Sequence, residues 1–69
     1  MKASARFVKG RGQIFISGYD ATRDEGVALE HNNLVVFMPE STGETLIEFT
    51  VSSRYGLPVR KQISIQVNP

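Results

Sequence analysis

Basic residues gather around a Gly-Leu-Pro turn near the C-terminus. The stretch IEFTVSSRYGLPVRKQISIQVNP (47–69) contains Arg54, Arg60 and Lys61 with no acidic residue among 54–61. Such a cluster could be a basic patch that binds a ligand. The same stretch also fits a β-hairpin with solvated charges on its surface. Neighbouring residues of a strand point to opposite faces, so we expect Arg60 to point outward and Lys61 to share the core face, which divides the cluster in two.

A second basic stretch, FVKGRGQIFI (7–16), places Lys9 and Arg11 between glycines and beside Phe7 and Phe15. Basic, Gly-rich strands with aromatics bind single-stranded nucleic acid by stacking bases and neutralising phosphates. The stretch resembles the first RNA-binding motif of cold-shock domains, although those domains have an aromatic where Arg11 stands and an upstream tryptophan. This alternative predicts a five-stranded OB or cold-shock-like barrel. It also predicts that five basic residues converge beside an exposed phenylalanine: Lys9, Arg11, Arg54, Arg60 and Lys61.

Carboxylates and the single histidine offer little for metal chemistry. Asp20, Asp24 and Glu25 lie together in DATRDEG (20–26) and could supply oxygen ligands to Ca²⁺, but their spacing lacks the EF-hand pattern. A solvated polar loop is the competing interpretation. His31 has no second histidine or cysteine to form a metal site or a catalytic triad with. We therefore expect no metal site, although the sequence leaves open whether the loop with Asp20, Asp24 and Glu25 binds Ca²⁺.

Glu40, Glu44 and Glu48 are the remaining candidates for paired catalytic carboxylates. Glu48 falls on the outward face of an expected strand, and we place the other two on a turn, where nothing would desolvate a carboxyl group and raise its pKa. The sequence therefore predicts a protein that is not an enzyme and carries no cofactor.

Length and composition indicate one small domain, residues 1–69. The chain has no cysteine and a net charge of +1, so packing alone must hold the core, and charge alone does not imply nucleic acid or an anionic membrane. A chain of this size buries only roughly 60% of the surface that its unfolded form exposes. All seven acidic residues lie between basic ends of the chain. No apolar run is long enough for a membrane span or a signal peptide.

Alternation of apolar and polar residues predicts β-strands throughout. It is clearest in 45–52 and 59–67, which we expect to pair as a hairpin across SSRYGLP. The apolar run 32–38, closed by Pro39, predicts a strand covered on both faces or central in its sheet. Further strands are expected at 3–8, 12–18 and 27–30, which gives about six. The expected core comprises Phe7, Ile14, Ile16, Leu34, Val36, Ile47, Phe49, Val51, Ile63, Ile65 and Val67.

The C-terminal half (32–69) resembles the end of a bacterial immunoglobulin-like domain. The shared elements are an apolar strand with a Pro-initiated turn (FMPESTGE), a strand of the TLIEFTVSS kind, a hairpin tip (RYGLPV) and a last strand ISIQV. The chain is also similar to the TraQ lipoproteins of Bacteroidetes conjugative transposons, through ARFVKGRG (5–12) and YGLPVRKQISIQV (55–67). The resemblance implies an all-β fold, a small antiparallel immunoglobulin-like β-sandwich.

Such sandwiches present loops or sheet faces to other molecules and seldom catalyse reactions. The resemblance therefore implies a non-enzymatic binding or structural module of a bacterial envelope or surface protein. Its expected partner is another protein, or a second copy through an edge strand, because the chain is short for a full sandwich. Localisation would be extracytoplasmic for an excised domain and cytoplasmic for a full-length chain. The candidate contact residues are Arg54, Tyr55, Arg60, Lys9 and Arg11.

Overall fold

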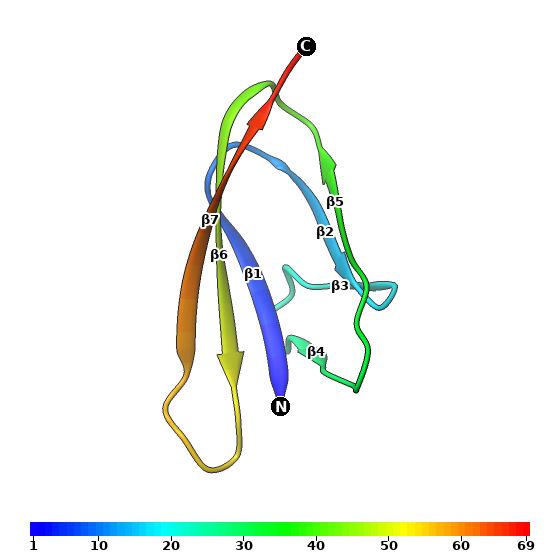
Figure 1. Cartoon of the computed structure of the whole chain (residues 1–69), viewed down its shortest axis with the longest axis vertical. Coiled ribbons are helices and arrows are strands. Elements are labelled where there is room, and N and C mark those ends of the chain that lie inside the picture. Colours follow the sequence, from blue (N-terminus) through cyan, green and yellow to red (C-terminus); the bar gives the residue numbers. More distant parts are fainter.

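The computed structural model describes all 69 residues and contains seven β-strands and no helix (Figure 1). The all-β prediction is therefore confirmed. No helix exists that could cross a membrane. The strands are β1 (Lys2–Lys9), β2 (Gly12–Ile16), β3 (Tyr19–Asp20), β4 (Val27–Ala28), β5 (Val35–Pro39), β6 (Gly43–Ser52) and β7 (Val59–Val67).

The strands form two antiparallel sheets, as expected of a small sandwich. The four-stranded sheet has the order β4-β1-β6-β7, and the three-stranded sheet has the order β3-β2-β5. The chain changes sheet four times: between β1 and β2, between β3 and β4, between β4 and β5, and between β5 and β6 (Figure 1). The edge strands are therefore β4 and β7 in one sheet and β3 and β5 in the other.

The predicted hairpin between the two C-terminal strands is confirmed. β6 and β7 pair along nine positions, from Gly43 opposite Val67 to Val51 opposite Val59. Alternation places Thr45 and Ile47 of β6 toward the second sheet, where both are buried, and Glu48 on the outward face. Side chains directly opposite each other lie on the same face, so the burial of β6 residues identifies the inward-facing residues of β7.

One side of the sandwich is closed by the backbone that follows β3. The amide of Ala21 donates to the carbonyl of Ile14 in β2 at 2.9 Å, and the carbonyl of Ala21 accepts from the amide of Ala5 in β1 at 2.8 Å. Ala21 is fully buried and thus ties the two sheets together. No side chain larger than a methyl group stands between the sheets at this position.

The buried core is small and rich in alanine. Its fully or nearly fully buried members are Ala3, Ala5, Ile14, Ile16, Ala21, Val27 and Ile47, together with Thr45. Phe7, Phe37 and Phe49 pack against this core while remaining partly exposed, and the rings of Phe7 and Phe37 lie 6.1 Å apart between centroids. The centre of the sandwich therefore lies between β1, β2 and β6.

Part of the predicted core was wrong. Leu34 and Ile63 are exposed, because they precede or belong to edge strands that no further element covers at these positions. Val36 is exposed because it lies opposite Phe15 on the outward face of its sheet, away from the buried Ile14 and Ile16. The run 32–38 forms an edge strand beginning at Val35, not a central one, and Pro39 ends that strand where a turn was expected to begin.

Two further expectations were wrong in detail. Glu44 was assigned to a turn, but it lies in β6 because that strand begins at Gly43. The region DATRDEG was assigned wholly to a loop, yet Asp20 belongs to the two-residue strand β3. The small buried residues Ala3, Ala5 and Ala21 were missing from the predicted core.

Candidate functional site: the open side of the sandwich

The inward face of β7 is largely apolar, and its first half is uncovered. Val59 lies opposite Val51 and Ile63 lies opposite Ile47, so both point to the side of their sheet that carries the core. Nevertheless Val59 is 67% exposed and Ile63 is 41% exposed. Apolar side chains on the core face of a sheet are normally buried by the facing layer. The three-stranded sheet does not extend over residues 59–63 of β7, whereas Ile65 farther along the strand packs partly against the core.

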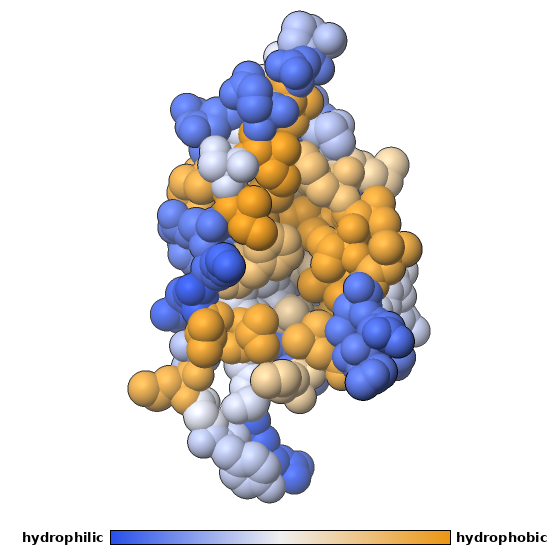
Figure 2. Space-filling model, in the orientation of Figure 1, coloured by the Kyte–Doolittle hydropathy of each residue, from blue (hydrophilic) through white to orange (hydrophobic).

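The corresponding edge of the second sheet is also uncovered. Val35 in β5 pairs with the buried Ile16 and therefore faces inward, yet it is 52% exposed. The hydrophobic residues over β7 and β5 appear on the same face of the molecule in Figure 2. We call the inward-facing residues Val59, Lys61 and Ile63 of β7, together with Val35 of β5, the open side.

Both strands that border the open side are edge strands. In an antiparallel sheet, the backbone N–H and C=O groups of alternate residues on an edge strand point away from the sheet and have no ladder partner. β7 has β6 as its only neighbour, and β5 has β2 as its only neighbour. The open side therefore combines unpaired backbone groups with exposed apolar side chains, which are the two features that an added strand uses.

Lys61 is the one charged residue on the inward face of β7. It lies opposite Phe49, whose ring packs against the core, and between the inward-facing Val59 and Ile63. Its ammonium group takes part in none of the ion pairs or side-chain hydrogen bonds of the structure. The predicted division of the basic cluster is confirmed, because Arg60 lies opposite Thr50 on the outward face.

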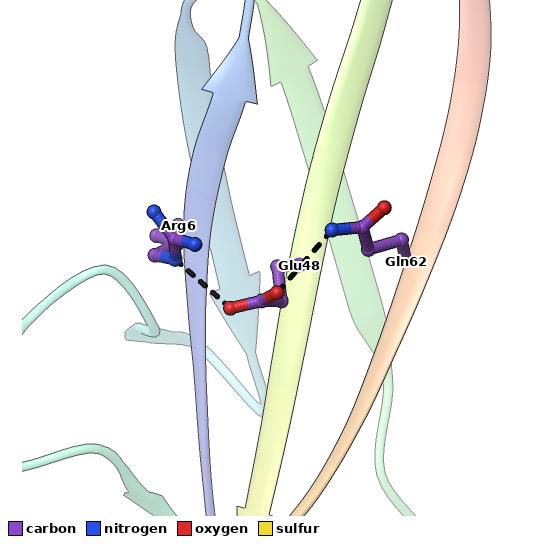
Figure 3. A network of polar contacts seen from close by, with 3 residues as sticks. All are labelled: Arg6, Glu48 and Gln62. Atoms are coloured by element: carbon purple, nitrogen blue, oxygen red, sulfur yellow. Dashed lines mark hydrogen bonds and ion pairs between the residues drawn. The ribbon is translucent and has the colours of Figure 1, made fainter.

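The outward face of the four-stranded sheet carries a polar network centred on Glu48 (Figure 3). Arg6 Nε donates to Glu48 Oε1 at 2.9 Å, and Gln62 Nε2 donates to Glu48 Oε2 at 3.3 Å. The hydrogen bond from Arg6, followed by that from Gln62, lowers the pKa of the Glu48 carboxyl group. Three strands, β1, β6 and β7, are joined by this one carboxylate.

A similar network lies farther along the same face. Lys9 Nζ donates to Glu44 Oε1 and Ser64 Oγ donates to Glu44 Oε2, both at 3.2 Å. The bond from Lys9, followed by that from Ser64, lowers the pKa of Glu44. Because both Glu44 and Glu48 are already engaged by cross-strand donors, this face is a solvated polar surface and not a pair of free carboxylates.

The acidic loop is likewise engaged internally. The Asp20 carboxylate accepts hydrogen bonds from the Thr22 hydroxyl at 2.6 Å and from the Thr22 amide at 2.9 Å, and these bonds lower its pKa. Arg23 lies 4.0 Å from Glu25 in an exposed ion pair. A shallow depression beside the loop is lined by Asp20, Arg23 and Glu25 among others. No group of three or more potential ligand side chains comes together to hold a metal ion.

The predicted contact residues lie in separate places. Lys9 pairs opposite Leu46 of β6, whereas Arg54 and Tyr55 lie beyond Ser52 at the other end of that strand. At about 3.4 Å per residue, the six steps along the strand from Leu46 to Ser52 alone span roughly 20 Å. Tyr55 is almost fully exposed, and Arg11 lies in the corner between β1 and β2. The five basic residues thus do not converge.

The open side was not predicted from the sequence, because Ile63 and the apolar run 32–38, which contains Val35, were both expected to be covered by other elements. One signal was present: Lys61 falls in phase with the core face of its strand, and a charge on that face indicates a strand that is not fully covered. No protein-family model matches the chain, and comparisons with curated proteins and with solved structures find no match either.

Proposed function

We propose that this chain is a non-enzymatic protein-binding module that accepts an extended segment of a partner protein along the edge of β7. The observation that carries the proposal is the exposure of Val59 and Ile63 on the core face of their sheet. A partner strand would pair with the free backbone edge and cover these side chains, as in other cases of strand addition. The immunoglobulin-like and TraQ resemblances, and a place in a bacterial envelope or surface protein, belong to the same proposal.

The competing function, binding of single-stranded nucleic acid, has less support. Lys9 is engaged by Glu44, and the basic residues that would follow a nucleic-acid backbone lie at both ends of the sheet. Phe7 packs against Phe37 and is not available as an exposed stacking platform. Phe15 is half-buried on the outward face of β2, in the sheet whose strands carry none of the five basic residues. Titration of a labelled single strand at two salt concentrations tests this function, since phosphate contacts give saturable binding that weakens steeply with salt.

Selection of peptides displayed on phage tests the proposed function. Random nine-residue peptides are selected against the immobilised chain, and the bound peptides are mapped by NMR shift changes. We expect the largest changes at residues 59–67 and at Val35. Peptides that shift only residues outside β7 and β5 would contradict the proposal.

Two variants provide a matched control for this selection. Ile63→Lys and Gln66→Lys each add one lysine to β7, but on its inward and outward faces respectively. We expect Ile63→Lys to weaken binding about tenfold, as the loss of one apolar contact implies, and Gln66→Lys to leave binding within about twofold. Equal effects of the two variants would argue against the inward face of β7 as the contact surface.

A further inference from the structure

Lys61 sits in the middle of the apolar surface that a partner strand would cover. The inward-facing residues Val59 and Ile63 flank it at two residues on either side, and its own cross-strand neighbour is Phe49. A strand added beside β7 would place a residue directly opposite Lys61 and would partly desolvate its ammonium group. Burying an unpaired charge is costly, whereas an opposite charge at the facing cross-strand position is stabilising.

A second copy of this chain does not supply that opposite charge through β7. The strand reads VRKQISIQV and contains no acidic residue. In any antiparallel self-pairing that keeps the inward face inward, Lys61 would lie opposite another lysine or an apolar residue. An inward-pointing charge on an edge strand is a known protection against edge-to-edge self-association. Lys61 therefore disfavours a homodimer through this edge and favours a partner of different composition.

We propose that β7 selects an extended segment of a partner protein in which an aspartate or glutamate lies opposite Lys61. Apolar residues two positions before and two positions after this acid cover Val59 and Ile63. Arg54 and Arg60 strengthen the preference for an acidic segment, because residues 54–61 include no acidic side chain. This inference rests on the proposed function and adds the chemistry of the partner.

Three synthetic peptides test the inference on the intact chain. The first is Ser-Thr-Val-Thr-Glu-Thr-Val-Thr-Ser, acetylated and amidated, which reads the same in both directions and therefore fits a parallel or an antiparallel register. In the second and third peptides, Gln or Lys replaces the central Glu. Dissociation constants come from NMR titration of the labelled protein at low salt. We expect the Glu peptide to bind about two- to fivefold more tightly than the Gln peptide and about tenfold more tightly than the Lys peptide.

Charge reversal of the protein supplies the control. The Lys61→Glu variant should bind the Lys peptide more tightly than the Glu peptide, and 1 M salt should reduce the difference in both proteins. Equal affinities of the three peptides for β7 would overturn the inference while leaving the proposed function intact. If none of the three peptides changes the NMR shifts of β7 residues, both the inference and the proposed function are overturned.

Sedimentation of the free protein tests the remaining possibility, that a second copy of the chain occupies the edge of β7. A monomer at high concentration is the expected result. A dimer that Ile63→Lys disrupts would mean that a second copy occupies the edge, and it would overturn the inference.

Discussion

Ile63 and Ile47 lie directly opposite each other in the β6–β7 ladder, yet Ile47 is 1% exposed and Ile63 is 41% exposed. The two side chains are the same residue type and lie on the same face of one sheet. The difference arises because the second sheet covers β6 at Ile47 and leaves β7 uncovered at Ile63. One position in a cross-strand pair thus belongs to the core and the other to the open side.

Alanine at these two positions should have unequal effects on stability. Ile47→Ala removes fully buried methyl groups and leaves a cavity, so we expect it to lower the free energy of unfolding by about 2–4 kcal/mol. Ile63→Ala should cost only about 1 to 1.5 kcal/mol, since its side chain is already partly in water. Urea denaturation of both variants measures the difference. Equal losses would mean that β7 is covered in solution.

Gly10 should be far less tolerant of a side chain than Gly18. Both have positive φ, at 84° and 85°, and so carry the same backbone penalty for alanine. A Cβ atom at Gly10 would lie 2.8 Å from Thr45 Oγ1, whereas a Cβ atom at Gly18 meets nothing within 4 Å. We expect Gly10→Ala to destabilise by about 1–3 kcal/mol more than Gly18→Ala, as overpacking of a core does. Similar melting temperatures for the two variants would contradict this account of the β1–β2 corner.

Thr45→Val should stabilise the fold. The hydroxyl oxygen of Thr45 is buried and has no hydrogen-bond partner, which leaves its desolvation uncompensated. Valine has nearly the same shape without the polar atom, so we expect a gain of about 1 kcal/mol in the free energy of unfolding. Thermal denaturation checks the sign. A loss of stability would indicate that the hydroxyl has a partner in solution.

Glu48 should contribute stability that depends on pH. Its hydrogen bonds from Arg6 and Gln62 lower its pKa in the folded protein below the ordinary value of 4.5. The contribution is therefore fully present above pH 4.5 and is lost as the pH falls through the lowered pKa of the folded state. Urea midpoints of Glu48→Gln and of the wild type should differ at pH 7 and converge as the pH falls below the lowered pKa of Glu48. A difference that persists unchanged at acid pH would contradict the assignment.

The sequence was sufficient to predict the strands with clear alternation. The range 59–67 coincides with β7, and 45–52 falls within β6, because apolar and polar residues alternate through most of both stretches. The outward orientation of Glu48 and the opposite faces of Arg60 and Lys61 follow from the same period. Alternation identifies the faces of a strand, and these predictions needed nothing more.

The open side could not be predicted from such local patterns. Ile63 looks like a core residue in sequence because alternation does not reveal whether another layer covers a strand. The apolar run 34–38 has no alternation, so the sequence does not show that Val35 faces inward and Val36 outward. Ala3, Ala5 and Ala21 were missed because alanine gives little hydrophobic signal, although the close approach of the two sheets at Ala21 requires a small side chain. The two-residue strand β3 is too short to show any period.

Hydrogen exchange along β7 tests the central claim most directly. Amide exchange rates of residues 59–67 are measured by NMR in the free protein and with a saturating concentration of a peptide selected as described above. In the free protein, alternate amides that point away from β6 should exchange fast, because nothing pairs with them. The bound peptide should slow these amides by about tenfold or more while leaving those already bonded to β6 little changed. If the alternate amides are already protected in the free protein, or if they stay fast with the peptide bound, the edge of β7 is not the site of strand addition.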